Sequence, residues 1–125
     1  MTNVMVVDDE PDMREMLNLM MQKEGFETEM AEDGADFLKK IDSFQPDIVI
    51  LDVMMPGLTT LEILEKLKEK QSKPKIILLT VVRLSDEEKE NISNMGNIVD
   101  YITKPFDLDN LMDSVKKNMK IEKYL

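Results

Sequence analysis

The sequence predicts one α/β domain with a doubly wound, parallel (βα)5 sheet and helices on both faces. Two observations predict this fold class. Five short apolar runs alternate along the 125 residues with segments of helical periodicity, and four of these runs are nearly continuous in Val, Ile, Leu or Met. Such runs are typical of strands buried on both faces. Strict alternation of strand and helix implies right-handed crossovers and three layers, helix on sheet on helix.

The apolar runs define the predicted strands. They comprise residues 3–7, 27–31, 47–51, 75–79 and 98–102. The second run, ETEMA, has few large apolar residues and is therefore predicted to form an edge strand.

The predicted helices lie between these runs. The first begins near Pro11, which suits a first helical turn, and ends at Gly25. Its apolar face has helical spacing and comprises Met13, Met16, Leu17, Met20 and Met21. Shorter stripes predict a second helix around residues 37–41, a third around 61–67 and a fifth from residue 108 to the end of the chain. A fourth helix, residues 85–94, is mostly charged and starts with a capping box formed by Ser85 and Glu88.

Composition excludes several function classes. The chain has no cysteine and no histidine, which excludes disulfides, thiolate metal sites, the usual zinc sites and Ser-His-Asp catalysis. A net charge of −10 argues against direct nucleic-acid binding. No apolar stretch reaches the roughly 20 residues of a membrane helix, and the N-terminus lacks the basic region of a signal peptide. We therefore expect a cytoplasmic domain without a membrane partner.

Polar residues follow the predicted strands at the points where the strands end. They are Asp8, Asp9, Asp52, Thr80 and Lys104. In open parallel sheets, ligands bind outside the carboxyl ends of the strands, so these residues are expected to share one edge. Three carboxylates, a hydroxyl and an ammonium in one cleft are suited to holding a divalent cation and a phosphoryl group.

The segments VVDDEPDMR, IVILDVMMPG, IILLT and YITKPF closely resemble the receiver domain of two-component response regulators, of the chemotaxis-regulator type. The resemblance covers essentially the whole chain and identifies residues 1–125 as one receiver domain. It implies the flavodoxin-like strand order 2-1-3-4-5.

The resemblance also implies roles for the residues at the strand ends. Asp52 corresponds to the phosphoacceptor. Asp9 corresponds to a direct ligand of Mg²⁺ (or Mn²⁺), and Asp8 to a residue that acts through a metal-bound water. Met54 would offer its backbone carbonyl to the metal.

The resemblance also implies which residues bind the phosphoryl group and which change conformation after phosphorylation. The Thr80 hydroxyl and the Lys104 ammonium would bind the phosphoryl group. Thr80 and Tyr101 would form the switch pair, and the bond between Lys104 and Pro105 would be a cis peptide.

The function implied is a phosphorylation-dependent signalling switch rather than an enzyme, beyond assistance to its own phosphoryl transfer and autodephosphorylation. The donor would be a histidine kinase or a phosphotransfer protein. Phosphorylation would change protein contacts through the surface of the fourth helix, fifth strand and fifth helix. We expect either a stand-alone receiver or a receiver cut from a longer protein. The expected recipient is therefore a downstream protein, or an output domain from which this receiver was cut.

Other functions remain open at this point. A receiver fold can act as a binding module that is independent of phosphorylation. An aspartate-based phosphatase normally has a second aspartate two positions after its nucleophile, where this chain has Met54. A flavodoxin-like FMN carrier would need a phosphate loop rich in Ser, Thr and Gly after the first strand, and none is present.

Three positions depart from the family pattern. Val81 replaces the usual small residue after Thr80, and we predict that it slows phosphoryl exchange or hydrolysis. Thr60 replaces the usual glycine before the third helix. The segment from Gly96 to Tyr101 is one residue longer than the common spacing.

Overall fold

The computed structural model describes residues 2–81, 83–95 and 97–119, which form a five-stranded parallel sheet. The strands lie in the order β2-β1-β3-β4-β5. Their bounds are β1 Asn3–Val7, β2 Glu27–Ala31, β3 Ile48–Asp52, β4 Lys75–Thr80 and β5 Ile98–Thr103. The predicted fold class and strand order are confirmed, and the weak second run is the edge strand β2.

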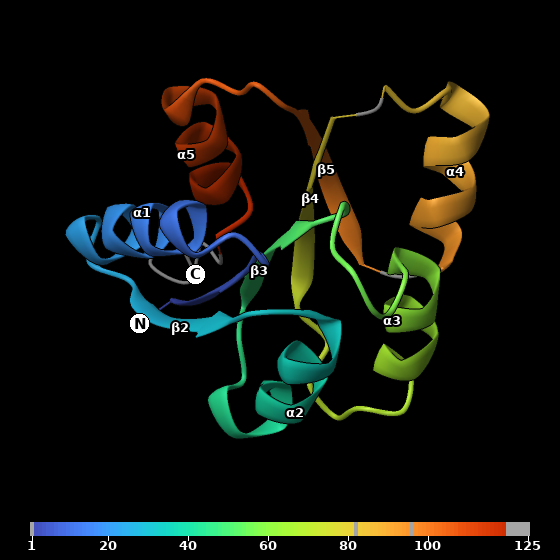
Figure 1. The fold of residues 1–125 in the computed structure, drawn as a ribbon, viewed down its shortest axis with the longest axis horizontal. Helices are drawn as coiled ribbons and strands as arrows, with labels where there is room; N and C mark the ends of the chain where they lie inside the picture. The colour runs from blue at the N-terminus through green and yellow to red at the C-terminus, as the bar shows by residue number, and fades with distance from the viewer. Residues whose placement is uncertain (1, 82, 96, 120–125) are drawn as a thin grey trace, which may run out of the picture.

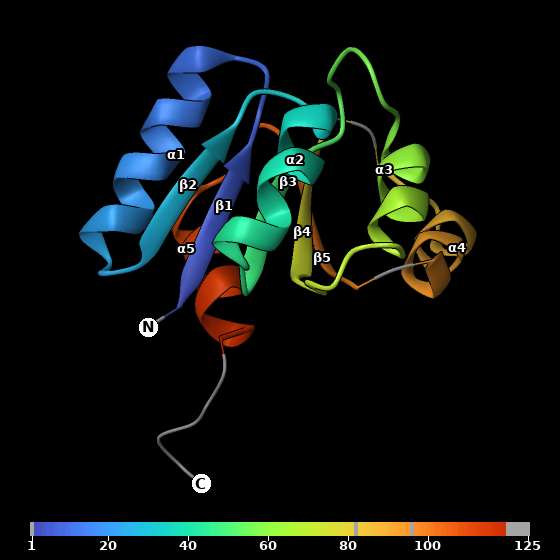
Figure 2. The ribbon, with the colours of Figure 1, turned by 90° about the horizontal axis from the view of Figure 1, so that it is seen from below.

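Within the described residues, four helices connect the strands and a fifth follows β5, and together they cover both faces of the sheet. Their bounds are α1 Pro11–Lys23, α2 Gly34–Phe44, α3 Thr60–Leu67, α4 Asp86–Met95 and α5 Leu108–Lys117. Helices α1 and α5 lie on one face, and α2, α3 and α4 lie on the other (Figures 1 and 2). None of these helices is long and apolar enough to cross a bilayer.

Each face of the sheet carries its own apolar core, because successive side chains of a strand point to opposite faces. In β1, Met5 belongs to the core under α2 and α3, whereas Val6 belongs to the core under α1 and α5. All five residues of the central strand β3 are buried. The continuous apolar sequence of β3 therefore reflects helices on both faces, and the strand ends at the buried Asp52.

The predicted bounds of several elements were wrong. The third strand covers Ile48–Asp52 rather than 47–51, and the fourth and fifth strands end at 80 and 103, one residue later than predicted. The polar residues at these ends still pair with the neighbouring strands and so belong to the sheet. Helix α5 ends at Lys117 rather than at the end of the chain, and residues 120–125 lie outside the described part.

Helix α4 is the most polar of the five. Its predicted capping box is confirmed: Ser85 Oγ accepts from the Glu88 N–H (3.1 Å), and Glu88 Oε1 accepts from the Ser85 N–H (3.2 Å). Ile92 packs against the core while remaining partly exposed. None of the α4 side chains whose burial is described is buried. Helix α4 is therefore held by fewer apolar contacts than its neighbours, as its composition predicts.

Strand β5 contains one residue more than its pairing with β4 requires. Ile76 pairs with Ile98, but the next residue, Ile77, pairs with Asp100. Val99 is therefore the extra residue of a β-bulge. This residue accounts for the additional length noted before Tyr101; Gly96, which opens that segment, lies outside the described residues.

The bulge leaves the flanking side chains on the faces that they would have in a regular strand without Val99. Ile98 and Tyr101 pack against the core under α3 and α4, whereas Ile102 packs against the core under α5. Asp100 also faces α5, where its carboxylate accepts a hydrogen bond from the Ser114 hydroxyl (2.5 Å). Without Val99, strict alternation would still place Ile98 and Tyr101 on one face and Asp100 on the other.

Candidate functional site

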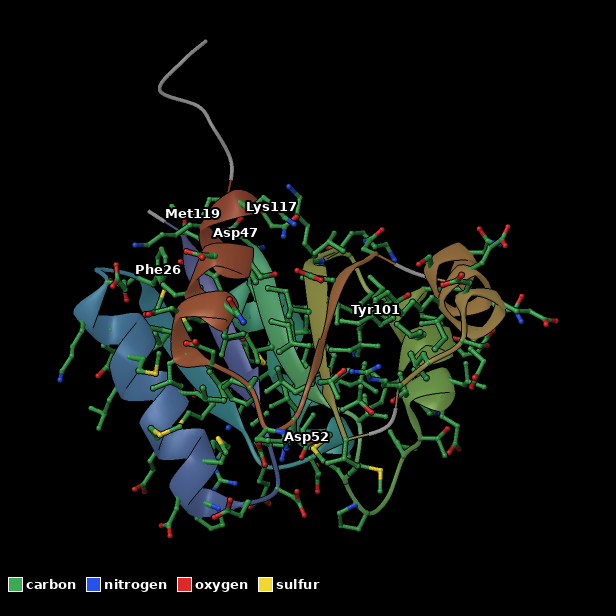
Figure 3. All side chains as sticks on the ribbon, turned by 90° about the horizontal axis from the view of Figure 1, so that it is seen from above. Phe26, Asp47, Asp52, Tyr101, Lys117 and Met119 are labelled. Atoms are coloured by element: carbon green, nitrogen blue, oxygen red, sulfur yellow. The ribbon has the colours of Figure 1, made fainter. Side chains whose placement is uncertain are left out.

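The carboxyl edge of the sheet gathers most of the predicted site residues. Asp8 follows β1, Asp52 ends β3, Thr80 ends β4 and Lys104 follows β5. The first three are unusual for polar residues in being 1%, 4% and 3% exposed. Figure 3 shows Asp52 at this edge, where the strands end. Buried polar groups are costly unless they are paired, so their concentration at one edge indicates a functional site.

Three carboxylates form the centre of the site. Asp8, Asp9 and Asp52 each offer an oxygen, and these oxygens all lie within 4.8 Å of one another. Asp9 is exposed, whereas the other two are buried. Oxygen ligands from carboxylates are those that Mg²⁺ prefers in proteins, so this donor set fits a hard divalent cation.

The Asp8 carboxyl shows the electrostatic cost of this arrangement. Its Oδ1 accepts a hydrogen bond from the Glu10 N–H (2.9 Å), whereas its buried Oδ2 has no hydrogen-bond partner among the described residues. Burial raises the pKa of Asp8 above its ordinary value, and the negative charges of Asp52 and Asp9 add to this effect. The unpartnered oxygen and the clustered charge both favour a cation at this position.

Asp52 is held from two directions. Its Oδ1 accepts a hydrogen bond from the Met54 N–H (3.1 Å) and lies 3.3 Å from the Lys104 ammonium. The next residue, Val53, donates its N–H to the Leu79 carbonyl (2.9 Å), which continues the β3–β4 ladder past the acidic side chain. The Asp52 carboxylate is thus fixed beside one cation and two anions.

Thr80 and Lys104 are joined through the backbone. The Lys104 N–H donates to the Thr80 carbonyl (2.7 Å), so the end of β5 stays beside the end of β4. The peptide bond between Lys104 and Pro105 is cis, the geometry that the family resemblance implies. This arrangement brings the Lys104 side chain back to Asp52.

The side chains of Met54 and Val81 point outward at the rim of the site. They are 58% and 54% exposed, respectively. The part of Met54 that contacts the site in the structure is its backbone N–H, which binds Asp52. Both side chains are therefore exposed beside site residues instead of filling the core.

Tyr101 does not join the site in this structure. Its hydroxyl donates to the Lys89 carbonyl of α4 (2.8 Å) and shares a hydrogen bond with the Ser93 hydroxyl (2.8 Å). The Lys89 ammonium lies 5.8 Å from the centre of the Tyr101 ring. Figure 3 places Tyr101 between β5 and α4, at a distance from Asp52. The side chain is therefore bound to α4.

A cavity of about 380 Å³ lies between the end of β4 and helix α4. Its lining residues come from the ends of β4 and β5 and from the segment before and within α4, and they are Thr80, Arg83, Leu84, Lys89 and Thr103. The cavity lies next to the Thr80 side of the site, so it provides space for movement between Thr80 and α4.

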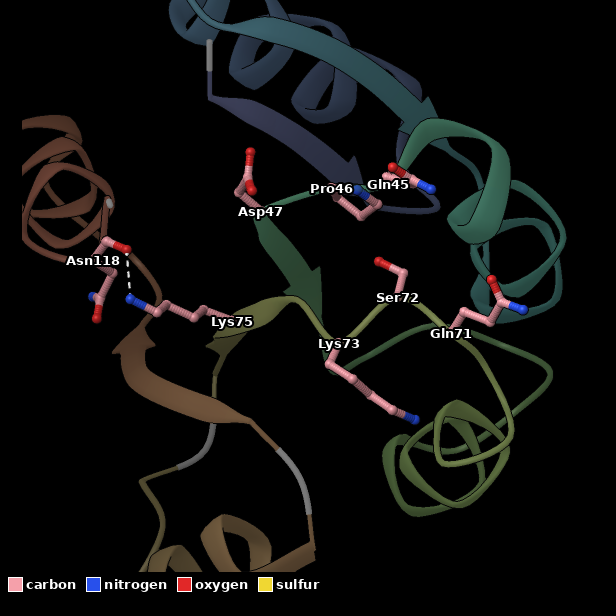
Figure 4. Close-up of a pocket in the computed structure, with 8 residues that line it drawn as sticks. All are labelled: Gln45, Pro46, Asp47, Gln71, Ser72, Lys73, Lys75 and Asn118. Atoms are coloured by element: carbon pink, nitrogen blue, oxygen red, sulfur yellow. Dashed lines mark hydrogen bonds between the residues drawn. The ribbon is translucent and has the colours of Figure 1, made fainter. Parts of the chain in front are cut away.

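Another cavity, of about 480 Å³, lies at the opposite, amino edge of the sheet (Figure 4). Asp47, Ser72 and Lys75 are among its lining residues. The Lys75 ammonium already binds the Asn118 carbonyl (3.0 Å). Asp47 is the one carboxylate among the described lining residues, so this cavity does not resemble the acidic site at the carboxyl edge.

Arg14 is a further residue beside the site, which the sequence did not indicate. Its guanidinium donates to the Asp8 backbone carbonyl (2.8 Å), which places it directly behind the acidic cluster. The signal in the sequence is a basic residue one turn into the helix that follows the Asp pair. Its contact with the loop depends on a side-chain conformation that periodicity does not specify.

Comparison with known proteins identifies the family. The model of the family described as response regulator receiver domain matches residues 4–116. The chain belongs to this family. The receiver domain is similar to the Vibrio cholerae chemotaxis protein CheY4, at 29% identity and a TM-score of 0.82, over 95% of this chain and 99% of that chain.

The receiver domain is also similar to the Thermotoga maritima response regulator TrrA. A structure of TrrA in complex with Mg(2+)-BeF matches at 40% identity and a TM-score of 0.78, covering 95% of this chain and 100% of TrrA. A structure of TrrA in complex with the histidine kinase ThkA matches at 39% identity and a TM-score of 0.77, covering 96% of this chain and 100% of TrrA. The chain is thus a receiver domain of two-component signalling.

Proposed function

We propose that this receiver domain is a phosphorylation-dependent switch that accepts a phosphoryl group on Asp52 from a histidine kinase or a phosphotransfer protein. The observation that carries the proposal is the position of buried Asp52, within 4.8 Å of two further carboxylates and 3.3 Å from the Lys104 ammonium. The similarity to TrrA, which has been solved with Mg(2+)-BeF and with a histidine kinase, supports the same function.

Asp8, Asp9 and Asp52, together with the Met54 carbonyl, would hold Mg²⁺ or Mn²⁺. The unpartnered Asp8 Oδ2 and the proximity of the three carboxylates support this assignment. A bound cation supplies the positive charge that lets an anionic nucleophile and an anionic phosphoryl group approach each other.

Asp52 is the nucleophile. One of its carboxylate oxygens forms the new bond to phosphorus, while the bond from phosphorus to the donor imidazole nitrogen breaks and its electron pair stays on that nitrogen. The Lys104 ammonium, already 3.3 Å from Asp52 Oδ1, and the Thr80 hydroxyl then bind phosphoryl oxygens. Catalysis is mainly positioning and charge stabilisation, as expected for phosphoryl transfer.

Thr80 and Tyr101 would convert this local change into a surface change. When Thr80 turns toward the phosphoryl group, Tyr101 exchanges its bonds to α4 for a position nearer the site. The surface formed by α4, β5 and α5 then changes its preference for partners, as a population shift between two arrangements. The cavity beside Thr80 supports this proposal because it offers room for the movement.

The partners of this surface would be proteins: a downstream target or an output domain of the same regulator. The domain itself would assist only its own phosphoryl transfer and autodephosphorylation. We place this activity in the cytoplasm, with residues 1–125 acting as one receiver domain without direct contact to nucleic acid or membrane.

Intact-mass spectrometry tests the proposal. After incubation with acetyl phosphate and Mg²⁺, we expect one added phosphoryl group on the wild-type chain and none when EDTA replaces Mg²⁺. Asp52→Asn should abolish the adduct. Asp113→Asn, which makes the same chemical change at an exposed position on α5, should leave it intact.

Two results would contradict the proposal: no adduct on the wild-type chain, or an undiminished adduct on the Asp52→Asn variant. The first result would instead favour a receiver fold that binds its partners independently of phosphorylation.

A further inference from the structure

The loop that carries the two metal-site aspartates is held by a residue outside the acidic cluster. Arg14 lies in the first turns of α1 and is half-buried. Its Nη1 donates a hydrogen bond of 2.8 Å to the backbone carbonyl of Asp8. That carbonyl belongs to the peptide group that joins Asp8 to Asp9.

The other bonds of this loop hold the backbone on either side of Asp9 but not the Asp9 side chain. The Asp8 N–H donates to the Ala31 carbonyl (3.2 Å), and the Asp8 carboxylate accepts from the Glu10 N–H (2.9 Å). No described residue donates a hydrogen bond to the Asp9 carboxylate, which is exposed. The direction of the Asp9 side chain therefore depends on the peptide plane that Arg14 holds.

We propose that Arg14 is a positioning residue of the metal site, which orients the Asp8–Asp9 peptide so that the Asp9 carboxylate converges with Asp8 and Asp52. This inference rests on the proposed function of the cluster as a cation site. Residues that orient metal ligands through hydrogen bonds typically contribute 10–100-fold to metal affinity.

The positive charge of Arg14, acting alone, would lower the affinity of the site for a cation, whereas positioning of Asp9 would raise it. A guanidinium near the site repels a divalent cation, so removal of its charge should strengthen cation binding if Arg14 acted only through its field. Loss of positioning should weaken binding. The sign of the change in affinity therefore distinguishes the two roles.

The structure offers a matched control in the same region. Arg14 and Lys40 both line a cavity of about 200 Å³ between α1, β2 and α2. The Lys40 ammonium binds the Met30 carbonyl (2.8 Å) and the Asp36 carboxylate (3.0 Å), and it makes no bond to the loop of Asp8 and Asp9. Lys40→Met thus removes a nearby positive charge without releasing the loop.

The test is the Mg²⁺ affinity of the unphosphorylated protein, measured by isothermal titration calorimetry. We expect Arg14→Met to bind Mg²⁺ about 10-fold more weakly than the wild-type chain. Arg14→Lys keeps one donor and should restore part of the loss. Lys40→Met should bind as tightly as the wild-type chain, or more tightly. Circular dichroism checks that each variant is folded.

A second measurement follows the loop without metal. In EDTA, the amide resonance of Asp9 in ¹⁵N NMR spectra should broaden or shift in Arg14→Met and stay unchanged in Lys40→Met. Unchanged or tighter Mg²⁺ binding by Arg14→Met would overturn this inference alone. Absence of Mg²⁺ binding to the wild-type chain would overturn the proposed function with it.

Discussion

At Asp8, a buried carboxylate oxygen without a hydrogen-bond partner lies beside two further carboxylates. Its pKa is raised by burial and by the neighbouring charges, so the charged form is less favourable in the folded chain than in the unfolded chain. The metal-free protein therefore loses stability at this residue. A carboxylate with this property is a candidate for a functional role, because the fold alone gains nothing from it.

We predict that Asp8→Asn stabilises the metal-free protein at neutral pH. The amide keeps the oxygen that accepts from Glu10 and removes one buried charge. A buried oxygen left without a partner costs about 1–3 kcal/mol, and Asn replaces it with an N–H₂ donor beside two carboxylates, so a gain of about 1 kcal/mol in the free energy of unfolding is expected. Urea unfolding in EDTA measures it, with Asp113→Asn as an exposed control.

The pH dependence of this gain has a definite sign. The pKa of Asp8 is raised on folding. The loss of stability caused by its charge is therefore complete when the pH is above this raised pKa, and it fades as the pH falls from the raised pKa toward the pKa of the unfolded chain. The advantage of Asp8→Asn should therefore shrink in acid. Saturating Mg²⁺ should stabilise the wild-type chain more than the variant. A variant that is less stable than wild type in EDTA at neutral pH would disprove this account.

Val81 provides a second prediction at the scale of a single residue. It directly follows Thr80 and is 54% exposed at the rim of the site, where the family usually has a smaller residue. Val81→Ala should open the approach to Asp52 and speed phosphorylation by acetyl phosphate or hydrolysis of the phosphorylated form. Time-resolved intact-mass measurement gives both rates. Val99→Ala removes the same atoms from an exposed valine in β5 and serves as the control. Equal rates in the wild-type chain and Val81→Ala would refute the prediction.

Among the elements, β5 differs most from a regular strand. Its bulge inserts Val99 between Ile98 and Asp100 while the flanking side chains keep their faces. Deletion of Val99 should give a regular β4–β5 ladder in which Asp100 still reaches Ser114 on α5. We predict a folded protein whose free energy of unfolding lies within about 1 kcal/mol of wild type.

Deletion of Asp100 is the matched comparison, because it shortens β5 by the same one residue. It leaves the Ser114 hydroxyl, which is 4% exposed, without its acceptor. The free energy of unfolding of the variant without Asp100 should therefore be about 1–3 kcal/mol lower than that of the variant without Val99. Thermal and urea unfolding of both variants measure this difference. Equal stabilities would show that Val99 is not the dispensable residue of β5 and that the bond from Ser114 to Asp100 adds no stability.

For the whole molecule, the sequence predicted the order of elements and the edge of the sheet at which the polar site residues lie, because both depend on which segments are buried. The continuous apolar character of β3 requires helices on both faces, and the chain direction then places Asp52 at the carboxyl edge with Asp8 and Thr80. Such features follow from periodicity and topology alone. The spatial convergence of the three carboxylates follows from the same rules.

Other features depend on contacts that periodicity does not encode. The extra length before Tyr101 was visible in the sequence, but its location at Val99 depends on which side chains the two cores accept. The bonds of Tyr101 to α4 and of Arg14 to the Asp8 carbonyl depend on side-chain conformations. The end of α5 was also misplaced, since no glycine or proline marks it.

The central claim is that Asp52 accepts the phosphoryl group, and direct mapping of the modified residue tests it. Borohydride reduces an aspartyl phosphate to homoserine, which peptide mass spectrometry locates in the sequence. After treatment of the wild-type chain with acetyl phosphate and Mg²⁺, we predict homoserine at position 52 alone. Homoserine at position 8 or 9, or none at all, would contradict the account.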